Sequence, residues 1–149
     1  MCRGHAAEPD RYRAATVRVE LPYKAERGFD ALYGLEITEL SDTVVRGRVV
    51  VRDELKQILG LVHGGVFASI AESLASIGTA VAVAGDGKVA SGLSNQTSFL
   101  RPITEGTIHG VAQVRHRGRT TWVWGVEISD DSERLCVLTR MTVAVRDPH

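Results

Sequence analysis

This chain of 149 residues has few cysteines and a formal net charge of zero. The only two cysteines, Cys2 and Cys136, form no CxxC pair and belong to no Cys/His set with metal-ligand spacing, so we expect neither a disulfide framework nor a zinc site. Eighteen Lys and Arg residues balance eighteen Asp and Glu residues, so no field of the whole molecule attracts nucleic acid or an anionic membrane. Any anionic ligand must therefore be met by a local group of arginines.

A secretory signal is also lacking, because the first residues contain no apolar core. Residues 1–22 are charged and weakly patterned, which predicts a loosely held arm ahead of one domain over residues 23–149. The isolated cysteines suit a reducing compartment. We therefore expect a cytoplasmic protein.

One stretch, from Gly64 to Ala84, has almost no charge and carries a single charged residue, Glu72. Apolar residues recur in it at spacings of four, three and four, which predicts a helix: Ile70, Leu74, Ile77 and Val81. Small or polar residues are expected on the other side: Ser69, Glu72, Ser76 and Thr79. A helix that is apolar or small nearly all round is usually enclosed by its domain, so Glu72 is expected to be buried or in a cleft.

Three interpretations of Glu72 are open at this point. It could be an ordinary surface residue of an amphipathic helix, or the stretch could span a membrane, although Glu72 and the many Ser and Ala residues disfavour insertion. An isolated buried carboxylate costs several kcal/mol, so a buried Glu72 is either held by hydrogen-bond donors or used in chemistry. The surroundings favour the functional interpretation.

The remaining pattern predicts strands separated by turns, after a short helix or turn over residues 23–34. The strands are expected at about residues 35–40, 43–51, 89–93, 96–100, 107–116, 121–129 and 135–145. Consecutive hairpins indicate an antiparallel sheet, and one helix cannot cover both faces of a parallel sheet. The fold class is therefore α+β, with an antiparallel sheet wrapped around one long helix. Its outer face and edges predict oligomerisation.

The segment HGGVFASIAESLAS resembles the signature of hotdog-fold acyl-CoA thioesterases, in particular the Arthrobacter-type 4-hydroxybenzoyl-CoA and phenylacetate-type group. Gln57 lies six positions before His63, Glu72 nine after it and Ser76 four after Glu72, which is similar to that family's Gln, His-Gly, Glu and Thr/Ser set. The likeness covers about residues 33–146. It departs at residues 98–100, where several relatives place a histidine beside the acyl group.

The resemblance implies an acyl-CoA thioesterase in which Glu72 acts as the nucleophile that forms an anhydride, or as the base that activates water. Glycines at a helix start leave backbone N–H groups free and let a substrate approach closely. By resemblance the Gly64 N–H is assigned to polarise the thioester carbonyl, with the Gly65 N–H as second choice. The alternative for the pair is a simple tight turn.

Three further residues receive supporting roles from the resemblance. Ser76 could hold the carboxylate or the water, although a serine also bonds readily to its own helix backbone. Gln57 could donate to the carbonyl region or orient water, unless it is a solvated loop residue. His63 is expected to be mainly structural and to orient the Gly-Gly turn through a ring hydrogen bond.

The spacing of Gly64 and Glu72 suggests a shared site. Eight residues of α-helix separate them by roughly 12 Å, whereas both groups must reach the same reacting atoms. We therefore expect antiparallel helices of two subunits, with Gln57, His63 and Gly64 from one and Glu72 and Ser76 from the other. The family's dimeric sites imply the same, with a homodimer as the minimum active unit and a homotetramer as the expected assembly.

Coenzyme A is part of the substrate, and no metal or redox cofactor is implied. Its phosphates need cationic and backbone donors. By resemblance the candidates are Arg101, Gly118, Arg119 and Thr120, although exposed arginines in turns are commonly just solvated. No nucleic acid or membrane is expected as a partner.

Two other functions compete with thioester hydrolysis. A hotdog dehydratase acting on acyl thioesters would need a catalytic histidine placed with the acid, and its helix usually begins with Pro-Gly. A non-catalytic acyl-CoA-binding module would not need the combination of Glu72, Gln57 and Ser76. The resemblance is compatible with an aromatic or a medium-chain acyl group, and the sequence does not identify which.

Overall fold

A computed structural model describes residues 20–148, so most of the arm predicted over residues 1–22 lies outside the described residues. The elements in chain order are β1 (Tyr23–Lys24), α1 (Phe29–Tyr33), β2 (Glu36–Leu40), β3 (Val44–Val50), a 3-10 turn (Asp53–Leu55), α2 (Gly64–Ala84), β4 (Val89–Phe99), β5 (Thr107–Arg117), β6 (Thr121–Ser129) and β7 (Leu135–Arg146). The strands form one antiparallel sheet in the order β1-β2-β3-β5-β6-β7-β4.

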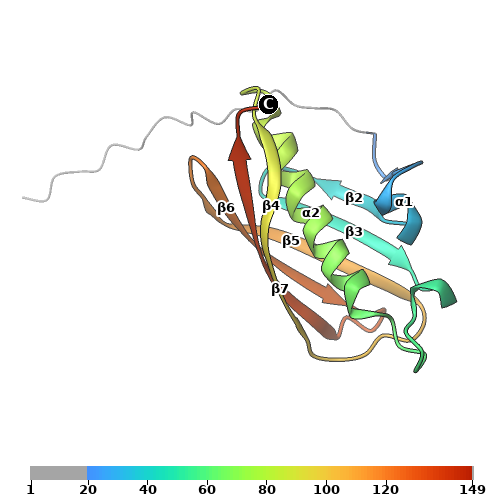
Figure 1. The fold of residues 1–149 in the computed structure, drawn as a ribbon. Coiled ribbons are helices and arrows are strands. Elements are labelled where there is room, and N and C mark those ends of the chain that lie inside the picture. Colours follow the sequence, from blue (N-terminus) through green and yellow to red (C-terminus); the bar gives the residue numbers. More distant parts are fainter. Residues whose placement is uncertain (1–19, 149) are drawn as a thin grey trace, which may run out of the picture.

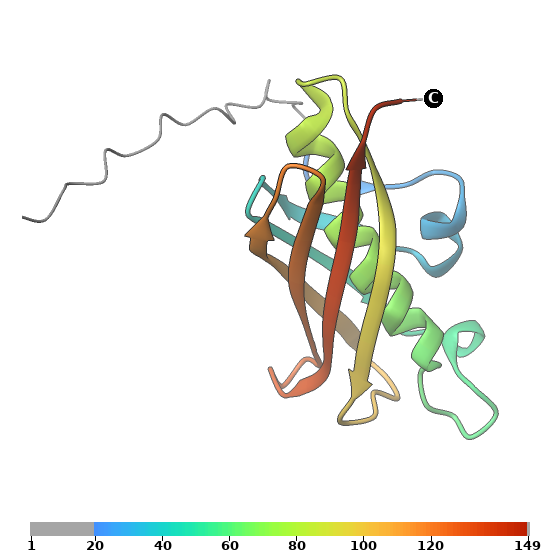
Figure 2. The same cartoon turned by 60° about the vertical axis from the view of Figure 1, so that its left-hand side comes forward.

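The long helix α2 lies along one face of this sheet (Figures 1 and 2). Its buried side chains include Phe67, Ile70 and Leu74, which pack into the apolar core. Core strand β6 adds Trp122 and Trp124, which are 2% and 0% exposed, as expected for sheet-packing residues. The predicted sheet around a single helix is confirmed.

The helix is less enclosed than its composition suggested. By length and composition α2 could cross a membrane. Half of its most apolar stretch is buried inside the fold, however, and the core helix of a soluble protein has the same length and composition. Ile77 and Val81, expected on the buried stripe, are only half-buried. The other side of α2 is open in the single chain.

Thr79 also differs from the prediction. It was expected on the small, polar side of the helix, but it is fully buried and does not lie on the open side. Its hydroxyl donates to the carbonyl oxygen of Ala75 at 2.9 Å and accepts from Nε1 of Trp124 at 2.9 Å. Both hydrogen-bonding roles of the hydroxyl are filled, so its burial carries little penalty. Helical spacing alone could not reveal a partner 45 residues away.

The two strands predicted at residues 89–93 and 96–100 are one strand, β4, with an irregularity between Gly92 and Ser94. Two polar residues near the predicted gap form hydrogen bonds within the fold. Asn95 donates from Nδ2 to the carbonyl oxygen of Ala68 on α2, and Thr97 donates to Oδ1 of Asn95. Strand β7 pairs with β4 over its whole length and keeps it continuous.

Candidate active site

The start of α2 is organised by His63, its N-cap residue. Nδ1 of His63 accepts a hydrogen bond from the Gly65 N–H at 2.9 Å. The segment before it is fixed by hydrogen bonds from His63 N to Leu55 O at 2.8 Å and from Val62 N to Ile103 O at 2.9 Å. This agrees with the structural role expected for His63.

The two glycines of the helix start differ in what their N–H groups can do. The Gly65 N–H is occupied by His63, whereas the Gly64 N–H has no acceptor among residues 20–148. An unpaired N–H at the first position of a helix of 21 residues also carries the positive end of the helix dipole. The geometry therefore favours Gly64 over Gly65 as the donor to a substrate carbonyl.

A pocket of about 470 Å³ opens beside Gly64. We call it the Gly64 pocket, and its main lining residues are Gln57, Gly64, Phe67, Phe99, Leu100 and Arg101. The Phe99 ring covers Gly64 so closely that a Cβ there would lie 2.9 Å from Cζ of the ring. A side chain at this position would have to displace the Phe99 ring, which is 57% exposed.

Gln57 lies half-buried in the loop that leads to α2. Its side-chain oxygen accepts from the Leu59 N–H, and its backbone N–H donates to Leu61 O at 2.8 Å. The oxygen is therefore used within the loop, which leaves the side-chain amide nitrogen as the group able to donate to a ligand.

Glu72 is exposed in the single chain, so the expectation that its own domain buries it is wrong. The carboxylate has no hydrogen-bond or ion-pair partner among residues 20–148. It lies against β4, where a Cβ on Gly92 would be 3.0 Å from Oε1 of Glu72. Ser76, one turn further along α2, is half-buried. The open side of α2 thus presents an unpaired carboxylate with a small polar neighbour.

The chain does not bring all of the predicted phosphate contacts together. Arg101 lines the Gly64 pocket, and its Nη1 donates to Leu135 O at 2.6 Å. The turn at residues 118–120 lies at the opposite end of β7, where the Val145 N–H donates to Thr120 O at 3.0 Å. Ten residues of strand separate these two points, which corresponds to roughly 33 Å.

Within that turn the three residues are not equivalent. The Gly118 N–H donates to Thr121 O at 3.0 Å, and a Cβ on Gly118 would lie 2.7 Å from the same oxygen. Gly118 is therefore needed for the turn itself. The N–H groups of Arg119 and Thr120 have no acceptor among residues 20–148.

A polar cluster beside Glu72 was not predicted from the sequence. Tyr33 OH lies 2.6 Å from Oδ1 of Asp30 and 2.9 Å from Oγ of Ser73, and Ser73 donates to Oδ1 of Asp30 at 2.7 Å. Burial raises the pKa of Tyr33 well above its usual range, and the hydrogen bond to Asp30 adds to the rise. The cluster fastens α1 to α2. Its only sequence signal is the Asp30–Tyr33 spacing, since Ser73 lies 40 residues beyond Tyr33.

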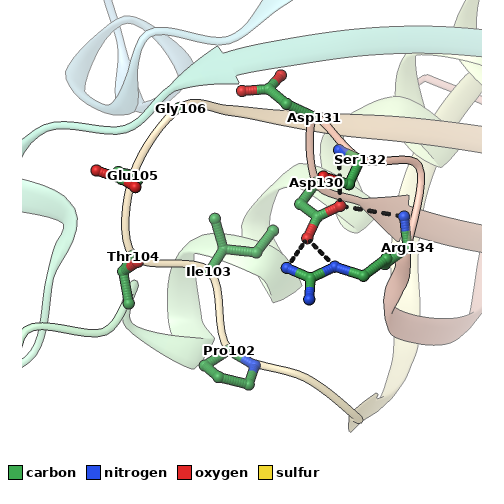
Figure 3. A pocket seen from close by; sticks show the side chains of 9 residues that line it. All are labelled: Pro102, Ile103, Thr104, Glu105, Gly106, Asp130, Asp131, Ser132 and Arg134. Carbon is green, nitrogen blue, oxygen red and sulfur yellow. Dashed lines mark hydrogen bonds and ion pairs between the residues drawn. The ribbon is translucent and has the colours of Figure 1, made fainter.

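A further pocket lies between the loop that follows β4 and the turn between β6 and β7 (Figure 3). Asp130, Asp131 and Arg134 each have an ionisable partner, whereas Glu105 has none among residues 20–148. Nη2 of Arg134 lies 2.7 Å from Oδ2 of Asp130, and Asp131 bonds Nε2 of His109 at 2.8 Å. These contacts lower the pKa values of Asp130 and Asp131, the Arg134 and His109 hydrogen bonds being the respective main causes. None of the predicted site residues lines this pocket.

Comparisons with known proteins give one consistent result. The thioesterase superfamily matches residues 59–137. A Mycobacterium tuberculosis protein provisionally named an esterase, Rv1847, is 39% identical over 109 residues, which is 72% of this chain and 78% of that protein. Its structure superposes with a TM-score of 0.78 at 35% identity and covers 81% of this chain and 98% of that one.

Two relatives have more specific names. The proofreading thioesterase EntH of Cronobacter turicensis is 33% identical over 112 residues, covering 75% of this chain and 81% of the relative. The 1,4-dihydroxy-2-naphthoyl-CoA hydrolase of Escherichia coli is 32% identical over 111 residues, covering 74% and 81%. All of these matches include the start of α2.

Proposed function

The chain belongs to the thioesterase superfamily and is a thioester hydrolase, and from that premise we propose that it hydrolyses an acyl-coenzyme A to the free acid and coenzyme A. The observation that carries the proposal is the unpaired Gly64 N–H at the start of α2, opening into an apolar pocket rimmed by Arg101. The E. coli relative is named as a hydrolase of a coenzyme A thioester, which supports coenzyme A as the thiol part of the substrate.

In the proposed reaction the Gly64 N–H hydrogen-bonds the thioester oxygen and stabilises the negative charge that develops there. Glu72 then acts in one of two ways. Its carboxylate bonds to the carbonyl carbon, the C–S bond breaks and water cleaves the resulting anhydride; or it takes a proton from water while the water oxygen attacks. Coenzyme A leaves as a thiolate and is protonated. No metal or redox cofactor takes part.

The two groups must come from different subunits, since roughly 12 Å of helix separates them within one chain. The midpoint between Gly64 and Glu72 on α2 is Ala68, and Asn95 of the edge strand β4 bonds Ala68 O at 2.9 Å. A two-fold axis near this bond would pair the β4 edges of two copies and set their helices antiparallel. Among residues 20–148, no other strand pairs with that edge of β4.

This arrangement is supported by a second consequence. A two-fold axis near Asn95 would turn the second chain end for end, so that its 118–120 turn approaches the Gly64 pocket and Arg101 of the first. The predicted phosphate contacts, which one chain separates, would then serve one coenzyme A. Gln57, His63 and Gly64 of one subunit would act with Glu72 and Ser76 of its partner.

Release of thiol from a panel of acyl-CoAs tests this function. We expect turnover by the wild-type protein and a loss of kcat of at least about 100-fold in Glu72→Gln, which keeps the shape of the side chain but removes its charge. Glu127→Gln, at another exposed position, is the matched control and should keep the wild-type kcat.

Other results would contradict the proposal. Binding without thiol release would identify an acyl-CoA-binding module, and water addition to an enoyl-CoA would identify a dehydratase. Near-normal turnover in Glu72→Gln would remove Glu72 from the mechanism.

A further inference from the structure

A row of polar side chains runs from the core strands to the turn of α2 that carries Glu72. Asn95 of β4 donates from Nδ2 to Ala68 O at 2.9 Å, and Thr97 donates to Oδ1 of Asn95 at 2.7 Å. Thr97 is paired across the strands with Thr139 of β7, and their hydroxyl oxygens lie 2.9 Å apart. We call Asn95, Thr97 and Thr139 the Asn95 network.

Each hydrogen bond of the Asn95 network has a defined direction. A carbonyl oxygen only accepts, so Ala68 O fixes the amide nitrogen of Asn95 toward the helix and its amide oxygen toward Thr97. A hydroxyl has one proton, and Thr97 gives its proton to Asn95, so Thr139 donates to Thr97. Thr139 is 5% exposed and anchors the far end of the network in the core. The orientation of the Asn95 amide is therefore set by the sheet.

The bond to Ala68 also acts on the backbone of Glu72. Within an α-helix the carbonyl of residue 68 accepts the N–H of residue 72. Because α2 is helical from Gly64 to Ala84, Ala68 O receives the Glu72 N–H and the Asn95 amide together, one at each lone pair. Asn95 thus ties the helical turn that bears Glu72 to the sheet.

The same strand supports the Glu72 side chain. A Cβ on Gly92 would lie 3.0 Å from Oε1 and 3.5 Å from Cδ of Glu72, so the carboxylate rests on bare backbone. The pairing of β4 with β7 is irregular between Gly92 and Ser94, and irregularities such as bulges redirect side chains beside active sites. Strand β4 therefore holds Glu72 at two points, through Asn95 at its backbone and at Gly92 under its carboxylate.

We propose that Asn95 is a positioning residue for Glu72, oriented by Thr97 and Thr139. This inference rests on the proposed function. Apolar side chains at these three positions would pack without needing any partner, whereas the satisfied network adds rigidity at the turn of Glu72. That rigidity matters for the reaction, because a catalytic group displaced by about 1 Å can lose about 100-fold in rate.

The experiment measures kcat and KM of Thr97→Val and Thr97→Ser with the acyl-CoA of the panel that the wild type turns over fastest. Valine keeps the shape of threonine but removes the hydroxyl that orients Asn95, whereas serine keeps a hydroxyl. We expect kcat to fall about 10-fold in Thr97→Val, with KM within about two-fold of wild type, and to stay near wild type in Thr97→Ser. Asn95→Leu, which removes the amide, should lower kcat at least as far.

A double-mutant cycle separates positioning from a role in folding alone. Because Asn95 acts through Glu72, Asn95→Leu should add less than about two-fold to the loss already caused by Glu72→Gln. If Asn95→Leu does not fold, Thr97→Val takes its place in the cycle. Gln96→Leu is the matched control, since Gln96 is the exposed neighbour on the opposite face of β4, and it should keep the wild-type kcat.

Two results would overturn the positioning role and leave the proposed function standing. One is a wild-type kcat in Thr97→Val and Asn95→Leu. The other is a loss from Asn95→Leu that multiplies in full with that of Glu72→Gln. Absence of thiol release by the wild type would instead remove the proposed function, and the positioning role with it.

Discussion

At the scale of single residues, the proposed chemistry depends on how two adjacent N–H groups are used. His63 occupies the Gly65 N–H and leaves the Gly64 N–H open to a ligand. The histidine that could be taken for a general base therefore has a defined task as a helix cap. In the proposed reaction its ring acts on the substrate only through the helix start that it holds.

This role of His63 predicts a difference between two substitutions. His63→Asn, which restores a good N-cap acceptor, should keep most of the turnover, whereas His63→Ala should lose about 1 kcal/mol of unfolding free energy and part of its activity. Urea unfolding and thiol release on the same preparations measure both quantities. Equal and severe losses of kcat in the two variants, with stability unchanged, would make His63 a direct participant.

The buried Tyr33 predicts a dependence on alkaline pH. Because burial and Asp30 raise the pKa of folded Tyr33 above its usual value near 10, the unfolded chain releases this proton first as the pH rises. The folded state then binds more protons than the unfolded state, so stability falls above about pH 10, by up to about 1.4 kcal/mol per pH unit for this group.

Tyr33→Phe should reduce that alkaline loss while costing about 1 kcal/mol at neutral pH, since it leaves Asp30 and Ser73 to bond each other alone. Unfolding at pH 7 and at pH 10.5 provides the comparison. Tyr23→Phe is the control, because Tyr23 is 47% exposed. An alkaline loss in Tyr33→Phe as steep as in the wild type would show that another group is responsible.

At the scale of elements, the position of α2 over the sheet depends on a close approach at Gly78. A Cβ there would lie 2.7 Å from Cη2 of Trp124 and 2.8 Å from Cγ2 of Val45, both within the core. Alanine gains about 1 kcal/mol over glycine in a helix interior, but overpacking a core costs about 1–3 kcal/mol. The steric cost of an alanine at Gly78 should therefore outweigh its gain in helix propensity.

We accordingly expect Gly78→Ala to destabilise the protein by up to about 2 kcal/mol, measured by denaturant unfolding. Ala80→Gly, at an exposed position of the same helix, calibrates the propensity term and should lose about 1 kcal/mol. A Gly78→Ala protein more stable than the wild type would mean that the helix can shift away from β6 at little cost.

The elements that the sequence predicted best are those with a strong local signal. α2 begins at Gly64 and ends at Ala84, and β6 spans Thr121–Ser129, as the apolar spacing and the turn residues indicated. The local sequence pattern did not predict the structure where a contact with a residue distant in the chain determines it. The sequence predicts two strands over residues 89–93 and 96–100, whereas in the fold they form one strand, in which Asn95 bonds Ala68 of the helix. For residues 23–34 the sequence predicts only a short helix or turn, because the hydrogen bond that fixes α1 comes from Ser73, far along the chain.

The candidate site was predicted unevenly for the same reason. The resemblance selected Gln57, Gly64 and Arg101, and the fold brings these three to one pocket. The exposure of Glu72 could not be deduced, because a helix that is small and apolar on its free side is compatible either with burial in its own domain or with an unoccupied face. The docking of α1 onto α2 could not be predicted either, because it joins Tyr33 and Ser73, which lie 40 positions apart.

At the scale of the whole molecule, the proposed reaction needs groups that a single chain holds apart. The unpaired Gly64 N–H and the unpaired Glu72 carboxylate lie eight residues apart on one rigid helix, and Arg101 and the 118–120 turn lie at opposite ends of β7. One two-fold axis beside Asn95 would correct both separations. We therefore propose a homodimer joined through β4 as the active unit, with pairing of two dimers into a homotetramer as the further expectation.

The measurement that tests this central claim most directly uses purified heterodimers. Gly64→Pro removes the N–H at the first helix position, where the proline backbone fits, and its ring also takes up the space under Phe99; Glu72→Ala removes the carboxylate. Each homodimer should be inactive. A heterodimer with one substitution in each chain should regain one working site, because the intact Gly64 and the intact Glu72 then face each other across the axis. A heterodimer with both substitutions in one chain and a wild-type partner should stay inactive. If the second heterodimer is the active one and the first is not, each chain works alone and the shared site is wrong.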